Sequence, residues 1–149
     1  MSTNLGSKDL TGAVKVTLTL SNFYDEEGAR HGLLRPDQIR RTSVEALVDT
    51  GATRLVLPKA TAEALGLTIL GQVGVRFADE RTETRDRVGI VVVELMGRRT
   101  EVDAIVEPSR SVALLGQIPL ESLDFWVDPS GQRLVPNPES PDVQLSKMQ

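Results

Sequence analysis

Residues 45–52 read EALVDTGA, and this short stretch decides how the rest of the chain is interpreted. An apolar strand runs directly into Asp49, which is followed by Thr50 and Gly51. Aspartate is depleted in strands and an unpaired buried carboxylate is costly, so an Asp at this position needs a reason. Gly51 lets the backbone turn sharply and approach another group closely, and Thr50 supplies a hydroxyl that can donate a hydrogen bond.

The same residues could simply form a turn, because Asp commonly accepts hydrogen bonds from its own backbone in turns. At ordinary residue frequencies, an Asp-Thr-Gly tripeptide arises by chance in roughly 3% of chains of this length. The interpretation of Asp49 therefore depends on the elements around it.

Alternating apolar and polar residues predict strands along most of the chain, and residues 14–20 are the clearest example. Pro58 can begin a helix over residues 59–65, with Gly66 at its C-terminal cap and Leu67 folding back on it. Further strands are predicted at 43–48, 54–57, 73–77, 82–95, 100–106, 112–116, 125–127 and 133–135, and short helical turns at 36–39 and 119–123. Many short strands with one or two short helices predict a mainly β, closed barrel-like domain.

Composition divides the chain into three parts. Residues 1–12 are polar and are expected to be a flexible lead-in, and residues 13–135 carry all the predicted strands. Residues 136–149 contain three prolines and few apolar side chains, so they are expected to be a disordered tail. Within the middle part, residues 21–40 break the strand pattern and predict a surface excursion.

Charge and composition argue against several classes of function. The net charge of −4 argues against a nucleic-acid surface, which needs a basic patch. The chain has no cysteine, so disulfides, thiolate catalysis and cysteine-based zinc sites are excluded. No apolar run approaches the roughly 20 residues that span a bilayer, and the first residues lack the apolar region of a secretory signal. We therefore expect a soluble, cytoplasmic protein without membrane contact.

The order of these elements resembles the retropepsin-like aspartic peptidases, over residues 14–135. In that family an apolar strand leads into Asp-Thr/Ser-Gly, usually followed by Ala, and residues 47–52 fit this pattern. A hairpin called the flap comes next, and residues 73–95 are in the right place for it. Two hydrophobic residues and a Gly then support the catalytic loop, and residues 114–116 match them. The resemblance implies a single-lobe closed β-barrel with a flap hairpin.

The resemblance also implies a role for each matching residue. Asp49 would be the catalytic carboxylate of an endopeptidase that needs no metal or other cofactor. Because one chain offers one such motif, a homodimer would bring two Asp49 side chains together on a peptide or protein substrate. Support of the catalytic loop is assigned to Thr50, Gly51, Ala52, Leu114, Leu115 and Gly116, and substrate contact from the flap to Phe77, Ala78, Asp79 and Glu80.

Two features depart from the retroviral members of the family. Many of these place an Asp shortly after the catalytic loop and pair it with an Arg after the second Gly. Here the corresponding stretches are Thr53-Arg54 and Gln117-Ile118, so that ion pair is absent. The excursion at residues 21–40 and the helix after Pro58 are more similar to the small free-standing bacterial type.

Other interpretations remain open at this point. The same fold could serve as a catalytically silent module that dimerises and binds peptides, or the motif could be accidental in an unrelated β domain. His31, the only histidine, is interpreted as a solvated loop residue, and residues 25–27 (DEE) as a solvated acidic turn without the ligand spacing of a calcium loop. Trp126 is expected in the core or at an interface.

Overall fold

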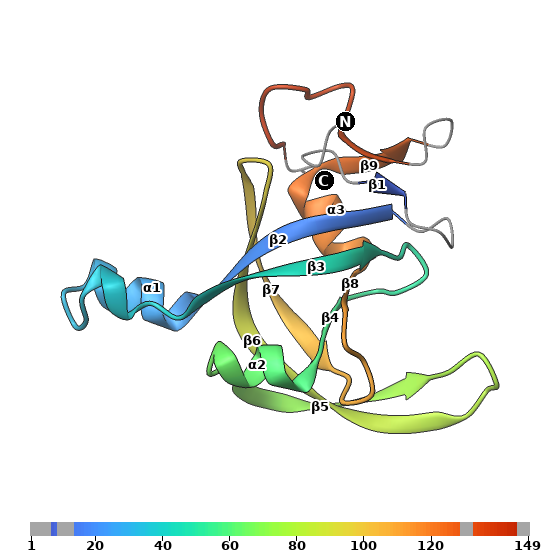
Figure 1. Cartoon of the computed structure of the whole chain (residues 1–149), viewed down its shortest axis with the longest axis horizontal. Helices are drawn as coiled ribbons and strands as arrows, with labels where there is room; N and C mark the ends of the chain where they lie inside the picture. The colour runs from blue at the N-terminus through green and yellow to red at the C-terminus, as the bar shows by residue number, and fades with distance from the viewer. Residues whose placement is uncertain (1–6, 9–13, 129–132, 146–149) are drawn as a thin grey trace.

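Ten strands and three α-helices make up the fold in the part of the chain that a computed structural model describes, namely residues 7–8, 14–128 and 133–145 (Figure 1). In chain order the strands are β1 (Ser7–Lys8), β2 (Val14–Asn22), β3 (Arg41–Val48), β4 (Leu55–Leu57), β5 (Thr68–Arg76), β6 (Thr82–Leu95), β7 (Arg98–Val106), β8 (Ala113–Leu115), β9 (Phe125–Asp128) and β10 (Arg133–Pro136). The helices are α1 (Phe23–Arg30), α2 (Lys59–Ala64) and α3 (Gln117–Leu123), with a 3-10 turn, η1, at Pro36–Gln38.

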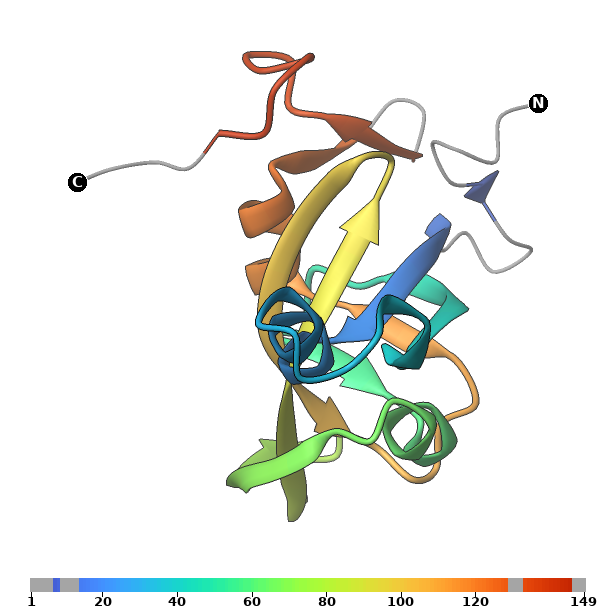
Figure 2. The same cartoon turned by 90° about the vertical axis from the view of Figure 1, so that its left-hand side faces the viewer.

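A single sheet closes on itself to form a barrel. Eight strands pair in the order β1-β2-β3-β8-β4-β7-β6-β5, and a further pairing of β2 with β6 joins the two ends of the ring. Six strands lie in the ring, while β1 and β5 extend it at its edges. Figure 2 shows β2 (blue) beside β6 (yellow). The mainly β, closed barrel that the sequence predicts is thereby confirmed.

Alternate residues of each strand fill the barrel interior. On β2, Val14, Val16, Leu18 and Leu20 are buried, and the residues between them are at least partly exposed. Fully burying one such side chain contributes about 2 kcal/mol to stability. The core is aliphatic apart from Phe125, its one aromatic member among the described residues, because aromatic residues make up only 3% of the chain.

The predicted cap of α2 is confirmed. Gly66 adopts a φ of 61°, a left-handed conformation that favours glycine. Its amide donates to the carbonyl of Glu63 at 3.0 Å, and the amide of Leu67 reaches back to Ala62 at 3.2 Å. This double hydrogen bond ends the helix and sends the chain into β5.

Helix α1 is an element that the sequence does not reveal. Asn22 caps it by accepting a hydrogen bond from the amide of Asp25. The helix is polar on most of its surface, so no apolar period predicts it. The expected solvated acidic turn is wrong for two of its residues: Asp25 is buried against Arg40 at 2.8 Å, and Glu26 pairs with Arg99 at 2.7 Å. The hydrogen bond from Arg40 holds the pKa of Asp25 below its ordinary value, despite the opposing effect of burial.

The two ends of the chain differ from the expectation of loose segments. Within the lead-in, Ser7–Lys8 form β1 on the edge of β2, and the rest of residues 1–12 lies outside the described residues. The expected disorder of residues 136–149 is wrong for residues 136–145. Pro136 is the last residue of β10, and residues 137–145 (Figure 1, dark red) hold specific contacts. Gln144 bridges the backbones of Arg99 and Ser122, and the hydroxyl of Ser140 donates to Asp124.

Asp124 gathers the contacts that hold this tail. It follows α3 with a φ of 63°, and its carboxylate also accepts from the side chain of Asn137 and the backbone of Leu145. Arg98 lies beside it, with its guanidinium donating to the carbonyl of Asp124 at 2.7 Å. The hydrogen bonds from Ser140 and Asn137 lower the pKa of Asp124 from its ordinary value of 3.8.

We expect Asp124→Asn to destabilise the protein by about 2 kcal/mol at pH 6, because the charged hydrogen-bond acceptor is lost. Asparagine tolerates the left-handed backbone, so the change tests the charge rather than the turn. A lowered pKa in the folded state gives stability that is present above the unfolded pKa and is lost as pH falls through the folded value. The difference in the free energy of unfolding between wild type and Asp124→Asn should therefore be smaller at pH 3 than at pH 6.

Urea unfolding at pH 6 and pH 3 measures both parts of this prediction. Asp142→Asn is the matched control, since Asp142 is exposed in the same segment and should matter little at either pH. Equal stabilities of wild type and Asp124→Asn at pH 6 would show that the tail does not depend on this carboxylate.

Candidate active site

Asp49 stands at the end of β3, where three strands meet. β3 pairs with β2 on one side and runs parallel to β8 on the other. The amide of Asp49 continues this ladder by donating to the carbonyl of Leu115 at 3.0 Å. The backbone of Asp49 is thus fixed between two buried strands, while its side chain is only partly buried.

A tight turn follows Asp49 and shapes the loop. The carboxylate oxygen Oδ1 accepts a hydrogen bond from the amide of Gly51 at 2.9 Å, and the carbonyl of Asp49 accepts from Ala52 at 3.1 Å. A side chain on Gly51 would place its Cβ 3.2 Å from the same Oδ1. Glycine at this position therefore keeps the carboxylate uncrowded.

Strand β8 and the start of α3 support this loop from behind. The amide of Gln117 donates to Ala52 at 2.8 Å, and the amide of Ile118 donates to Thr53 at 2.9 Å. Gly116 packs so tightly that a Cβ there would lie 2.3 Å from the carbonyl oxygen of Arg54. The structure therefore brings the loop residues close to the three residues of the later strand.

Four half-buried apolar side chains lead away from Asp49. Leu47, Leu114, Val56 and Ile105 alternate with buried core residues on β3, β8, β4 and β7, so they face away from the barrel interior. The register links them in a row: Leu47 with Leu114, Leu114 with Val56, and Val56 with Ile105. We call this row the apolar strip. By the same alternation Asp49 shares the face of Leu47, at one end of the strip.

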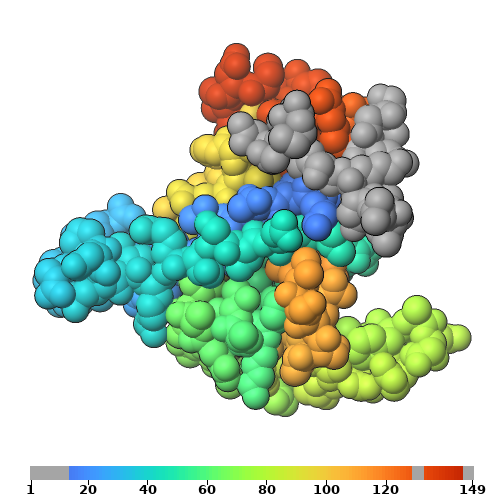
Figure 3. All heavy atoms as spheres, in the orientation of Figure 1, coloured from blue at the N-terminus to red at the C-terminus, as the bar shows by residue number. Residues whose placement is uncertain are grey.

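The predicted flap is confirmed as a hairpin of β5 and β6. Its tip is closed by hydrogen bonds from Phe77 to the carbonyl of Arg81 at 2.8 Å and from Glu80 to Phe77 at 2.9 Å. Ala78, Asp79 and Glu80 are exposed at the tip. Figure 3 shows the hairpin projecting from the body, with an open notch between it and the rest of the molecule.

Charged side chains fix the base of the flap to the loop after β7. Arg85 donates to Glu107 at 2.8 Å and to Glu83 at 2.7 Å, and its guanidinium also lies 5.4 Å from the ring of Phe77. Burial alone would raise the pKa of Glu107, but hydrogen bonds from Arg85 and Ser109 outweigh it and leave that pKa below its ordinary value. The pair therefore stays ionised at mildly acidic pH.

A second charged group, which sequence reasoning missed, lies beside the apolar strip. Arg54 of the loop after Asp49 approaches Asp103 on β7 at 3.6 Å, and Arg87 on β6 donates to the same carboxylate at 3.0 Å. The register of β7 against β4 and β6 creates this cluster. The alternation of Arg85 and Arg87 on one strand is the only signal in the sequence.

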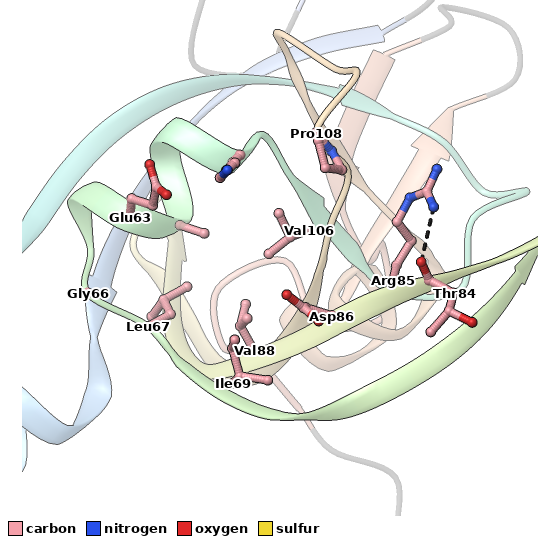
Figure 4. A pocket seen from close by; sticks show the side chains of 12 residues that line it. Glu63, Gly66, Leu67, Ile69, Thr84, Arg85, Asp86, Val88, Val106 and Pro108 are labelled. Atoms are coloured by element: carbon pink, nitrogen blue, oxygen red, sulfur yellow. Dashed lines mark hydrogen bonds between the residues drawn. The ribbon is translucent and has the colours of Figure 1, made fainter.

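The cavity drawn in Figure 4 is separate from Asp49. Its volume is about 440 Å³, and it lies between α2, the base of the flap and the end of β7. Its walls are apolar at Ala62, Val88 and Val106, and charged at Lys59 and Glu63. Val88 and Val106 are buried core residues, and none of the residues that line the cavity belongs to the loop of Asp49 or to the apolar strip.

Several exposed residues surround the loop of Asp49. Thr50 and Gly51 are exposed, and the side chain of Ile118 is 46% exposed although it is apolar.

Trp126 on β9 is 49% exposed, so it is not the core residue that was one of its two expected roles. His31 is exposed in the excursion, as expected, and lies 3.7 Å from Glu27. None of the helices among the described residues is long or apolar enough to span a membrane.

Comparisons with known proteins agree with this geometry. The family described as "gag-polyprotein putative aspartyl protease" matches residues 37–122, which is more than half of the chain. A retropepsin-like aspartic protease from Rickettsia conorii shares the fold with a TM-score of 0.55 at 17% identity, over 87% of this chain and 86% of that one.

A second similar structure is that of EIAV protease in complex with the inhibitor HBY-793. It has a TM-score of 0.54 at 18% identity, over 78% of this chain and 93% of that chain. A comparison with curated protein sequences finds no match. The matched segment contains Asp49, the flap hairpin and the Leu114-Leu115-Gly116 strand, and the chain belongs to this family of retropepsin-like aspartyl proteases.

Proposed function

We propose that the protein is an aspartic endopeptidase that hydrolyses peptide bonds with a water molecule activated by two Asp49 carboxylates, one from each subunit of a homodimer. The observation that carries the proposal is a single carboxylate held on an exposed loop. Asp49 is fixed by its own turn and by β8, while Thr50 and Gly51 beside it are open to a second copy of the chain. One such carboxylate is half of an acid–base pair.

The paired carboxylates would divide the chemistry between them. Two carboxyl groups in contact cannot both ionise easily, because the two negative charges would repel each other. The pair therefore shares one proton. The ionised carboxylate draws a proton from the water, which attacks the scissile carbonyl carbon. The protonated carboxyl donates to the carbonyl oxygen, and a proton then passes to the leaving amine as the C–N bond breaks.

The surrounding residues support positioning rather than proton transfer. The apolar strip, which contains Leu114 and Val56, offers a surface on which an extended peptide can lie beside Asp49. The flap would close over such a peptide and exclude water. Thr50 would hydrogen-bond across the two-fold axis beneath the carboxylate pair. We also propose that the protein is cytoplasmic, as the sequence leads us to expect.

The dimer gives the proposal its test. We expect cleavage of a diverse peptide library between pH 3 and 7, with the activity per subunit falling as the protein is diluted. Half a site has no acid–base pair, so the fall should follow the monomer fraction measured by analytical ultracentrifugation at the same concentrations. A fully active monomer would contradict the shared site, and peptide binding without cleavage would identify a silent binding module instead.

A further inference from the structure

The charged cluster beside the apolar strip contains more positive charge than it neutralises. Arg54 and Arg87 share one carboxylate, that of Asp103, and their side chains remain 34% and 31% exposed. Arg87 forms a hydrogen bond of 3.0 Å with this carboxylate, whereas Arg54 approaches it only to 3.6 Å. Two guanidinium groups against one carboxylate leave one positive charge at an accessible position.

Arg54 retains most of its donor capacity. A guanidinium has five N–H donors in a planar fork, and this fork matches the two oxygens of a carboxylate. Among the described residues, Asp103 is its only charged partner. The nearby acidic groups have other partners: Glu107 and Glu83 are held by Arg85, and Asp86 accepts from Gln72.

The cluster lies along the path of a bound peptide. Arg54 is two residues before Val56 and shares its face by strand alternation, and Asp103 is likewise two residues before Ile105. Arg87 is opposite Ile105 in the register of β6 and β7. A peptide on the apolar strip, with its scissile bond at Asp49, would therefore pass the guanidinium of Arg54 within a few residues.

We propose that Arg54, assisted by Arg87, binds the side-chain carboxylate of an Asp or Glu residue near the scissile bond, so that the enzyme prefers acidic substrates. The inference rests on the proposed function, because it assumes that the peptide binds beside Asp49. Arg54 and Arg87 act here as specificity residues. Asp103 holds them in place and competes with the substrate for their charge.

Matched peptides that differ only in one Glu or Gln near the cleavage site test the preference. We expect the kcat/KM ratio of the Glu to the Gln peptide to be about tenfold in wild type, the scale of one charge-assisted hydrogen bond. Arg54→Gln should bring the ratio close to one. Asp103→Asn should raise it severalfold, because a competing carboxylate is removed. Arg35→Gln, an exposed arginine in the remote excursion, is the control that should keep the wild-type ratio.

The pH dependence adds a readout that a merely structural role of Arg54 would not change. The pKa of a free glutamate side chain is about 4.3, so in wild type the kcat/KM ratio of the Glu to the Gln peptide should grow between pH 4 and pH 6. It should stay flat in Arg54→Gln. A ratio near one at both pH values in wild type, or an unchanged ratio in Arg54→Gln, would overturn the proposal.

Binding to a variant without Asp49 separates this inference from the proposed function. Fluorescence anisotropy can compare the affinities of the two peptides for Asp49→Asn and for Asp49→Asn combined with Arg54→Gln. Tighter binding of the Glu peptide that is lost in the double variant supports the subsite even if wild type cleaves nothing. Equal affinities of the two peptides for Asp49→Asn would overturn the subsite. Cleavage by wild type would then support the proposed function without this subsite.

Discussion

Asp49→Asn is expected to lower kcat/KM for peptide cleavage by roughly 10³-fold or more, the scale of losing a general acid–base group. The amide keeps the shape of the carboxylate, and its oxygen can still accept the hydrogen bond from Gly51. In a homodimer the substitution replaces both carboxylates, so no pair remains that can share a proton. The loop should therefore stay folded while the chemistry stops, which cleavage assays beside thermal unfolding and sedimentation will measure.

Asp37→Asn provides the matched control for this experiment. Asp37 lies in η1, is exposed and pairs only with Arg35 among the described residues. The control should cleave like wild type. If Asp49→Asn also cleaves like wild type, Asp49 does not carry the reaction, and the site must be sought elsewhere. If it neither cleaves nor folds, the carboxylate is a structural residue of the loop.

Structural features formed by residues that are close in the sequence could be predicted. The turn at Gly51 and the helix cap at Gly66 depend on neighbours within a few positions, and the flap hairpin joins two strands that follow each other directly in the sequence. Each of the three is found in the structure. The support of the loop by Gly116 followed from its resemblance to a known order of motifs rather than from periodicity. These features fix the barrel and the surroundings of Asp49.

Features that depend on distant partners could not be predicted. The charged cluster at Asp103 exists because the strand register brings residues 54, 87 and 103 together, and no local pattern gives that register. The ordered tail depends on Asp124 and Arg98, which are 16 and 42 residues before Ser140. The prolines and the few apolar residues of the tail predicted disorder. The contacts that order it are made by polar side chains, which a sequence pattern does not distinguish from solvated ones.

The need for glycine at position 116 is a matter of space. Its φ of −90° and ψ of −172° are extended values that any residue adopts, so backbone freedom does not explain it. A Cβ would lie 2.3 Å from the carbonyl oxygen of Arg54 and 2.7 Å from that of Ala52. Both contacts are with the backbone of the loop that follows Asp49, and neither atom can turn aside as a side chain would.

Gly116→Ala is therefore expected to destabilise the protein by about 3 kcal/mol or more, because either β8 or the loop must move. A displaced loop would also separate the two carboxylates, so cleavage should fall even in the molecules that remain folded. Urea unfolding measures the first effect and cleavage per folded subunit the second. Gly74→Ala is the control for stability, since a Cβ there would meet its nearest atom, of Thr82, at an ordinary 3.7 Å. Equal stability losses in the two variants would mean that Gly116 does not support the loop by close packing.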